Sequence, residues 1–510
     1  MSSRIPATLS KRLMQKVRSV ALLFVAFAGF AMASAAQATI VIPASERAVL
    51  LALYNNADGP DWTNHSGWNG PAGTECSWYG VVCWQTPGTF CQISFQGGGT
   101  LCPGNVGEIH LSKNKLFGTI QNIGLNSLTY LYWFDVSSNN LVNSLPDFSK
   151  APMRIFSAGF NQFAGSIPSL SGSVGLQYFD VSFNQLTGSI PSLAGLTSLH
   201  DFNVSGNQLS GSIPSLAGLT NLQNFTVHQN WQLTGTIPDL GGLASLRVFT
   251  AFQNQLSGPI PPLENVTNLE HFWVYDNQLT GTIPPIATLA NLIAFEVQGN
   301  HLSGTIPCLS TTYTCSSKLT QLTTFAAQIN ELTGSIPSLA GLSSLQSFNV
   351  GYNQLTGTVP PAPSTLTAGT SNLCPNGLTA SADGATNLAW DSATGVTPWN
   401  GTCGGTITQT ISFTSQPPSF PVANLAMDAH GTYAPSAITS TGLNTVILSI
   451  DASSVSVCRI GGNGIGDGIV TYFAPGTCTI NANAYGSAVY APAVQMQQQF
   501  HVYPLLQVVR

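Results

Sequence analysis

Charged residues are scarce in this chain. Asp, Glu, Lys and Arg make up 7% of its 510 residues, against about a quarter in an ordinary globular sequence. The 14 basic residues are outnumbered by 20 acidic ones, which gives a formal charge of −6. Because no basic surface is available, we expect neither nucleic acid nor an anionic membrane as a partner.

Several sequence motifs of enzymes and metal sites are also missing. The chain has no GxSxG elbow, HExxH helix or phosphate-binding loop, which are sequence signatures of common enzyme classes. Its ten cysteines include no CxxC pair and have no histidine beside them at ligand spacing, so a zinc site is not indicated. We therefore predict a protein that is not an enzyme and has no cofactor or metal.

Long hydrophobic runs are missing except near the start. Residues 1–38 read as a signal peptide, with basic residues from Arg4 to Arg18, an apolar stretch from Ser19 to Ala33, and small residues before Thr39. The apolar stretch is shorter than the roughly 20 residues that span a bilayer. We expect cleavage there, which lowers the formal charge to −11, and a secreted or cell-surface protein that is a monomer and does not insert into a membrane.

The cysteines of such an exported chain predict disulfides. They occur as near neighbours in the sequence, so five local bridges are the economical interpretation, although spacing alone does not fix the connectivity. The neighbouring pairs are Cys76 and Cys83, Cys91 and Cys102, Cys308 and Cys315, Cys374 and Cys403, and Cys458 and Cys478.

A repeat of about 23 residues dominates the middle of the chain. Its unit is L-x-x-F-x-V-x-x-N-x-L-x-G-x-I-P, as in Leu199 to Pro214, and a fixed period of this length is typical of a solenoid. The apolar alternation predicts one short strand per turn, with one face buried. The eleven repeat asparagines are Asn114, Asn139, Asn161, Asn184, Asn207, Asn230, Asn254, Asn277, Asn300, Asn330 and Asn353.

Two positions of the unit predict the interior. Ten turns carry phenylalanine five residues before the asparagine, from Phe134 to Phe348, and the first turn has Ile109. We expect these side chains to stack as an apolar spine. The asparagine amide should bond to backbone groups where the chain leaves the strand, because an unpaired buried amide would cost about 1 to 3 kcal/mol.

The pattern N-x-L-x-G-x-I-P resembles the plant-type leucine-rich repeat, which occurs in plant receptor ectodomains, in polygalacturonase-inhibiting proteins and in some exported bacterial proteins. The resemblance implies a β-rich solenoid with a parallel sheet on its concave face and disulfide caps at both ends. We expect an N-terminal cap over 39–105, repeats over 106–373 and a C-terminal cap over 374–405. Two irregularities, the extra Trp231 and a 30-residue spacing before Asn330, should bulge locally.

Within the expected N-terminal cap, Ser45 is placed to begin a helix that runs to Tyr54. The segment Cys76 to Cys83 resembles the paired-cysteine cap of the same family. The tryptophans Trp62, Trp68 and Trp78 are interpreted as core residues of this cap rather than as platforms for sugars.

The repeat ends before residues 406–510, where short β-rich runs such as Thr408 to Phe413 alternate with Pro and Gly turns. A block of this size suits a small all-β sandwich. It resembles bacterial immunoglobulin-like modules, which implies a bacterial source and a role as a spacer or adhesive unit.

Function should reside on the concave face. Residues one, two, four and six places before each asparagine should point outward from the sheet, and they include many aromatic and acidic side chains. The candidate ligand-binding residues are Trp133, Asp135, Phe160, Tyr178, Asp180, Phe183, Asp201, His228, Phe252, His271, Trp273, Tyr275, Asp276, Glu296 and Tyr352. Aromatic side chains could instead stiffen the sheet by stacking along it.

Because this face carries acidic residues and only Lys113 as a base, a basic or neutral partner is predicted. A protein partner is the first hypothesis, and a polysaccharide gripped by a surface adhesin is the second. A glycoside hydrolase is a remote third, because Asp135 and Asp180 should lie about 10 Å apart, near the upper limit for an inverting pair. We expect neither a cleft nor a raised pKa there.

Overall fold

The computed structural model of the protein describes residues 39–85, 92–93, 100–309 and 317–403. In the C-terminal part it describes 410–418, 422–423, 431–439, 446–454, 457–460, 470–472, 475–484 and 493–504. The predicted signal peptide, residues 1–38, lies outside the described residues. Within these ranges, no helix has the length and apolar character needed to cross a membrane.

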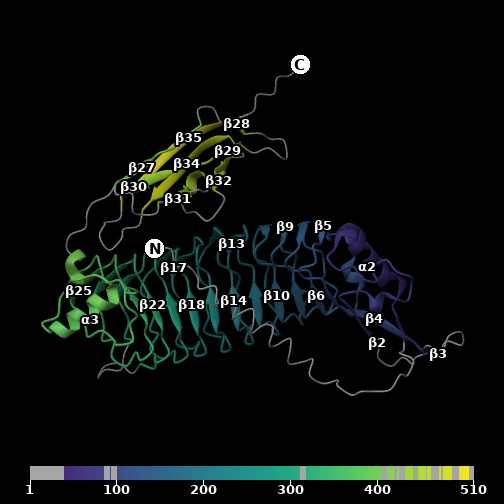
Figure 1. Ribbon diagram of the computed structural model, residues 1–510, viewed down its shortest axis with the longest axis horizontal. Coiled ribbons are helices and arrows are strands. Elements are labelled where there is room, and N and C mark those ends of the chain that lie inside the picture. The colour runs from purple at the N-terminus through teal and green to yellow at the C-terminus, as the bar shows by residue number, and fades with distance from the viewer. Residues whose placement is uncertain are drawn as a thin grey trace.

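A long parallel sheet runs through the solenoid (Figure 1). It begins at β1 (Thr39–Val41), and β2 (Val81–Gln85) and β3 (Gln92–Ile93) pair with β4 at its first end. One strand per turn follows. These strands are β4 (Thr100–His110), β6 (Trp133–Asp135), β8 (Ile155–Ser157), β10 (Tyr178–Asp180), β12 (Asp201–Asn203), β14 (Asn224–Thr226), β16 (Val248–Thr250), β18 (His271–Trp273), β20 (Ala294–Glu296), β22 (Thr324–Ala326) and β24 (Ser347–Asn349).

The predicted phenylalanine spine is confirmed. All ten phenylalanines are at most 1% exposed, and Ile109 is fully buried. Each ring stacks on the next, as between Phe202 and Phe225, whose centroids are 5.5 Å apart. Since the strands pair in register through these phenylalanines, the neighbouring residues of each strand must point away from the core.

The predicted bonding of the repeat asparagines to backbone groups is also confirmed, and we call this series of hydrogen bonds the asparagine ladder. The amide of Asn207 donates to the carbonyls of Val181 and Val204 at 3.0 and 3.1 Å, and its oxygen accepts from the amide of Leu186 at 3.0 Å. One asparagine more than the eleven predicted takes part, since Asn376 makes the same bonds to Val350 and Leu355. The ladder therefore continues into the expected C-terminal cap.

Short strands also line another side of the solenoid (Figure 1). At several turns a glycine adopts positive φ, for example Gly235 at 77°, where a residue with a β-carbon would be strained. The strands are β5 (Phe117–Thr119), β7 (Asn140–Asn143), β9 (Gln162–Ser166), β11 (Gln185–Thr187), β13 (Ser210–Ser212), β15 (Gln232–Thr234), β17 (Ser257–Pro259), β19 (Gln278–Thr280), β21 (Ser303–Thr305), β23 (Glu331–Gly334), β25 (Gln354–Thr358) and β26 (Gly377–Thr379).

Helix α2 (Ala44–Asn56) and three short 3-10 helices, Gly59–Asp61, Glu75–Ser77 and Leu125–Ser127, lie at the N-terminal end. The expected start at Ser45 is wrong, because Pro43 occupies the cap position and no side chain caps the helix. Proline suits this position, since the first amides of a helix have no intrahelical carbonyl to bond.

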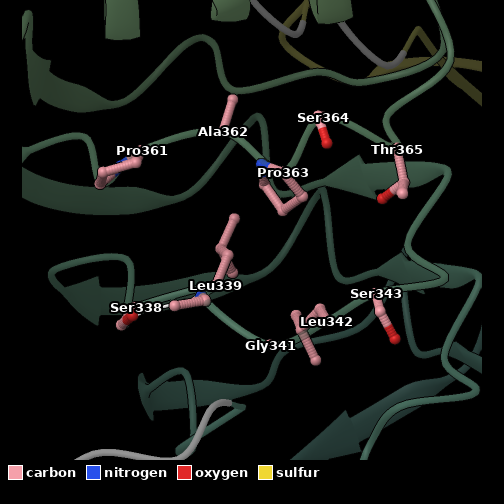
Figure 2. A pocket seen from close by; sticks show the side chains of 11 residues that line it. Ser338, Leu339, Gly341, Leu342, Ser343, Pro361, Ala362, Pro363, Ser364 and Thr365 are labelled. Carbon is pink, nitrogen blue, oxygen red and sulfur yellow. Dashed lines mark hydrogen bonds between the residues drawn. The ribbon is translucent and has the colours of Figure 1, made fainter.

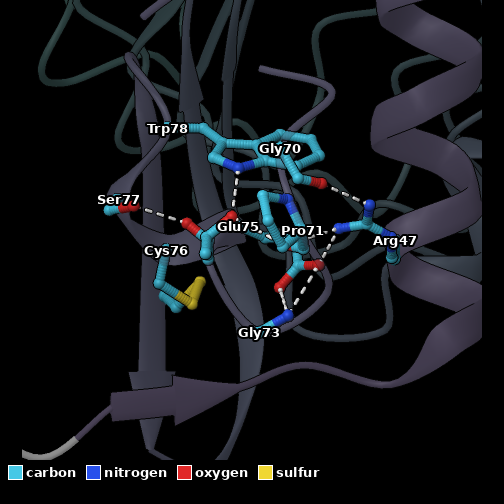
Figure 3. Close-up of polar contacts among 10 residues, drawn as sticks. Arg47, Gly70, Pro71, Gly73, Glu75, Cys76, Ser77 and Trp78 are labelled. Carbon is cyan, nitrogen blue, oxygen red and sulfur yellow. Dashed lines mark hydrogen bonds and ion pairs between the residues drawn. A yellow bond between two sulfur atoms is a disulfide. The ribbon is translucent and has the colours of Figure 1, made fainter. Parts of the chain in front are cut away.

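The predicted core role of the cap tryptophans is confirmed. Trp62, Trp68 and Trp78 are 3%, 6% and 2% exposed. Arg47 of α2 lies 5.3 Å from the Trp78 ring and pairs with the buried carboxylate of Glu75, as Figure 3 shows. The disulfide Cys76–Cys83 links this region to β2. These contacts cover the first turn of the solenoid with apolar rings and paired charges.

The C-terminal end of the solenoid carries α3 (Gly384–Thr394), a 3-10 helix (Trp399–Thr402) and the disulfide Cys374–Cys403. Asp383 caps α3 by accepting from the amides of Ala385 and Thr386. Cys308 is also disulfide-bonded. The predicted pairs Cys91–Cys102 and Cys308–Cys315 each include a residue, Cys91 or Cys315, outside the described residues.

A small β region follows, with its own core around the disulfide Cys458–Cys478. Most of its strand pairs are antiparallel. The strands are β27 (Ile411–Phe413), β28 (Val422–Ala423), β29 (Gly431–Tyr433), β30 (Ala437–Thr439), β31 (Ile447–Ile450), β32 (Cys458–Ile460), β33 (Val470–Tyr472), β34 (Gly476–Asn483) and β35 (Met496–Pro504), with a 3-10 helix at Ala452–Ser454.

Candidate binding surface

Two files of side chains point outward from the long sheet, one on each side of the phenylalanine spine. The first joins Trp133, Tyr178, Asp201 and His271 through successive strand pairs, and the second joins Asp135, Asp180, Trp273 and Glu296. This is the register that the sequence predicts. We call the surface that these files form, with the two positions before each repeat asparagine, the concave face.

Acidic residues gather over β10 and β12. The Asp180 carboxylate accepts from the Ser182 amide at 2.9 Å and from the Tyr178 hydroxyl at 3.2 Å. Asp201, on the next strand, accepts from the Asn224 side chain. Burial raises the pKa of Asp180 and of Asp201, and it raises the pKa of the Tyr178 hydroxyl together with the nearby Asp180 charge.

The raised pKa of Asp180 corrects one expectation, because no raised pKa was expected at the Asp135 and Asp180 pair. The cause is loss of water around the carboxylate rather than a cleft. Two surface pockets among the described residues include neither Asp135 nor Asp180. One lies at the C-terminal end of the repeats between 338–343 and 361–365 and is lined only by Ser, Thr, Leu, Ala, Gly and Pro (Figure 2). The other surrounds the ion pair of Arg247 and Glu270.

Aromatic residues gather further along the face. His228, Phe252 and Tyr275 form one stack, with ring centroids 4.2 and 4.4 Å apart. His271 and Trp273 lie side by side on β18, with centroids 5.1 Å apart. The predicted alternative of stacking along the sheet therefore holds for the first three rings.

The candidate residues differ in the exposed fraction of their side chains. Phe160 and Phe183 are 47% and 41% exposed and stack on each other at 4.7 Å. Phe252 and Tyr352 are only 2% and 9% exposed, so the expected exposure of these two is wrong. Phe252 is covered because its ring lies between those of His228 and Tyr275. The remaining candidates are partly exposed.

Some buried polar atoms of this surface lack a hydrogen-bond partner within the described part of the chain. They include Nε1 of Trp133, Nε1 of Trp273 and Nδ1 of His271. Burial lowers the pKa of His271 and lowers that of His228 to about 3, so both imidazoles are neutral at pH 7. Such neutral donors and acceptors can bond to a peptide group or a hydroxyl of a ligand.

Acidic side chains border the aromatic rings. Burial raises the pKa of Asp276 to about 6 and also raises the pKa of Glu296. Among the described residues, no group of three or more His, Cys, Asp or Glu is arranged so that it could hold a metal ion.

His110 is not among the residues predicted from the sequence, yet the same register places it on this face. It occupies the fourth position before Asn114 and pairs across the sheet with Asp135. Its Nε2 lies 2.5 Å from the Glu108 carboxylate, and its ring packs against Trp133 at 4.7 Å. Applying the repeat rule to the first turn, which lacks the phenylalanine, would have found it.

Comparisons with known proteins agree with this architecture. Residues 43–84 match the family described as "Leucine rich repeat N-terminal domain", and residues 175–196 match "Leucine Rich Repeat". A comparison with curated proteins gives no match. The fold and these matched segments together define a leucine-rich-repeat solenoid.

Solved structures with a similar fold include plant receptor ectodomains and a plant ice-binding protein. The Arabidopsis receptor kinase HAESA, in complex with the peptide hormone IDA and a co-receptor, is 27% identical over 66% of this chain and 54% of its own, with a TM-score of 0.51. A complex of the proteins PEPR1 and AtPEP1 is 24% identical over 66% of this chain and 51% of its own, with a TM-score of 0.50. The chain thus spans about half the length of each of these two structures.

Proposed function

We propose that this protein binds a protein partner through the concave face of the solenoid. The observation that carries the proposal is the accumulation of acidic and aromatic side chains on that face, outside the apolar spine. Aromatic residues concentrate binding energy in interfaces, and the fold resembles a plant receptor kinase solved in complex with a peptide hormone. The likeness supports recognition of a protein or peptide.

The charge of the face favours a basic partner segment. Asp180, Asp201, Asp276 and Glu296 are desolvated carboxylates, and a cationic side chain placed among them would restore the favourable interactions that burial removes. Such a contact would also speed association at low salt.

We further propose that the protein acts outside the cell or at its surface. Three disulfides among the described residues support this, because such bonds persist in oxidising compartments. A bacterial source, a monomeric state and an immunoglobulin-like spacer role for residues 406–510 are parts of the same proposal. The bacterial source and the spacer role rest on the sequence resemblance of residues 406–510 to bacterial immunoglobulin-like modules.

The test begins with capture of a partner from a secreted protein fraction, set beside a glycan array. Affinity for the captured protein is then measured by calorimetry for wild type, for Trp273→Ala and for the paired variant Asp201→Asn with Glu296→Gln. Loss of a central aromatic anchor should weaken binding by about 2 kcal/mol, roughly thirtyfold. The paired variant keeps side-chain shape and should weaken binding most at low salt.

The matched control replaces Thr282 and Thr305 by Ala. Both are exposed residues at the outer strands, so affinity should not change. The concave-face proposal fails if this control abolishes binding while the Trp273 and carboxylate variants bind like wild type. Circular dichroism of each variant checks that the solenoid is folded, since Trp273 is partly buried.

A further inference from the structure

One tryptophan of the N-terminal cap region is not a core residue. Trp84 on β2 is 50% exposed, whereas Trp62, Trp68 and Trp78 are almost completely buried. The pyrrole part of the Trp84 ring rests against Gly107 of β4, where an added β-carbon would come within 2.3 Å of the ring. Because Gly107 has no side chain, the exposed indole of Trp84 can lie directly against it.

Polar groups adjoin this ring. Tyr132 packs edge-on against Trp84 with centroids 5.2 Å apart, and its hydroxyl donates to the Glu108 carboxylate at 2.5 Å. The second oxygen of that carboxylate lies 2.5 Å from Nε2 of His110. Tyr132 therefore contacts both the exposed indole of Trp84 and the carboxylate of Glu108.

The electrostatic state of the carboxylate is set by the same contacts. The hydrogen bond from His110 is the largest cause that lowers the pKa of Glu108, and the hydroxyl of Tyr132 adds to it. Glu108 is therefore ionised at neutral pH. A carboxylate accepts hydrogen bonds at both oxygens, so its remaining lone pairs can accept from hydroxyl groups of a ligand.

We propose that Trp84, Tyr132 and Glu108 form a subsite for an uncharged β-linked glucan. A pyranose ring whose hydroxyls are all equatorial carries its C–H bonds on two apolar faces, and these faces are attracted to the negative face of an indole. Its equatorial hydroxyls lie in the ring plane, where they can donate to the Glu108 carboxylate, which bonds to the Tyr132 that packs against the indole. The ligand of this subsite is a polysaccharide, whereas the partner proposed for the concave face is a protein.

Charge argues for a neutral saccharide over an acidic one. The chain has a formal charge of −6, and Glu108 lies at the subsite, so a polyuronate would meet like charge. A peptide is less well matched, because the two rings in contact here, Trp84 and the partly exposed Tyr132, offer a small aromatic surface. An interface between proteins needs a larger area.

The test is affinity electrophoresis of the full chain in native gels that contain hydroxyethylcellulose, with polygalacturonate gels for comparison. Wild type should be retarded by hydroxyethylcellulose only. Trp84→Ala should lower the retardation constant at least tenfold, Trp84→Tyr should retain part of it, and Glu108→Gln should lower it severalfold. Trp231→Ala removes an indole that is 41% exposed elsewhere in the repeats and should behave like wild type.

Two results would overturn the subsite, namely no retardation of wild type or equal retardation of wild type and Trp84→Ala. If Trp84→Ala does not fold, Trp84→Tyr and Glu108→Gln decide, and wild-type retardation of both refutes the subsite. The Trp273→Ala variant separates the two proposals, because it should lose the protein partner and keep its retardation.

Discussion

At the scale of single residues, Asp276 has a carboxyl group that burial makes difficult to ionise. Its pKa rises from 3.8 to about 6, with loss of solvent as the largest cause and a hydrogen bond from Gln253 opposing it. The backbone is left-handed there, with φ of 53°, which asparagine tolerates as well as aspartate does. Asp276→Asn is therefore a conservative way to remove the charge.

The sign of the pH dependence follows from the raised pKa. Folding favours the protonated carboxyl, so this contribution to stability is present below the unfolded pKa of 3.8 and is lost as pH rises through about 6. The lost free energy is about 2 to 3 kcal/mol. We expect Asp276→Asn to unfold at higher urea than wild type near pH 7.5, with the difference shrinking near pH 4.

Comparing Asp276→Asn with wild type isolates the contribution of Asp276 to the pH dependence of stability. Asp180, Asp201 and Glu296 also have raised pKa values, but they contribute equally to both proteins. Parallel pH profiles of the two unfolding free energies would show that Asp276 is ionised without cost.

At the scale of elements, the phenylalanine spine couples each turn to the next. Phe225 is fully buried, and its ring stacks on Phe202 and Phe249 at 5.5 and 5.7 Å. Phe225→Ala should destabilise the solenoid by about 3 to 5 kcal/mol, since it removes a large buried side chain and leaves a cavity between two turns. Urea unfolding followed by circular dichroism measures the change.

Trp231→Ala is the matched comparison for the spine. This residue is an insertion in its turn and is 41% exposed, so its removal should change the unfolding free energy by less than about 0.5 kcal/mol. Equal stability of the Phe225 variant and wild type would mean that the spine contributes no packing energy.

At the scale of the whole molecule, the solenoid and the C-terminal β region have separate apolar cores. One core runs from Ile42 to Trp399, and the other contains Ile411 to Val502. The bridges Cys374–Cys403 and Cys458–Cys478 each lie within one of them. A chain that ends at residue 405 should therefore keep the unfolding midpoint of the solenoid.

Scanning calorimetry tests this separation. The full chain should show two heat-absorption peaks, and the shortened chain should keep one of them at the same temperature. Loss of the solenoid peak from the shortened chain would show that the two cores depend on each other.

The repeat alone was enough to predict much of the architecture. The period near 23 residues and the apolar residue at every second position predict the strands, the phenylalanine spine and the asparagine ladder. They do so because every turn repeats the same local chemistry. The outward positions of Asp180 and Trp273 follow from the same register. The start of α2 was missed because the proline at residue 43 outweighs the capping tendency of Ser45.

Exposure and ionisation were decided by tertiary structure. Sequence treats Phe252 and Phe183 as similar candidates, yet Phe252 is covered by rings from the two adjacent turns while Phe183 has one ring partner and the small Gly206 beside it. Trp84 is half exposed because β2 pairs with β4 and places it over Gly107. The sequence by itself determined the register of the solenoid, since register depends on local alternation. Only the tertiary structure determined which outward side chains remain open to a ligand, because their burial depends on residues more than twenty positions away.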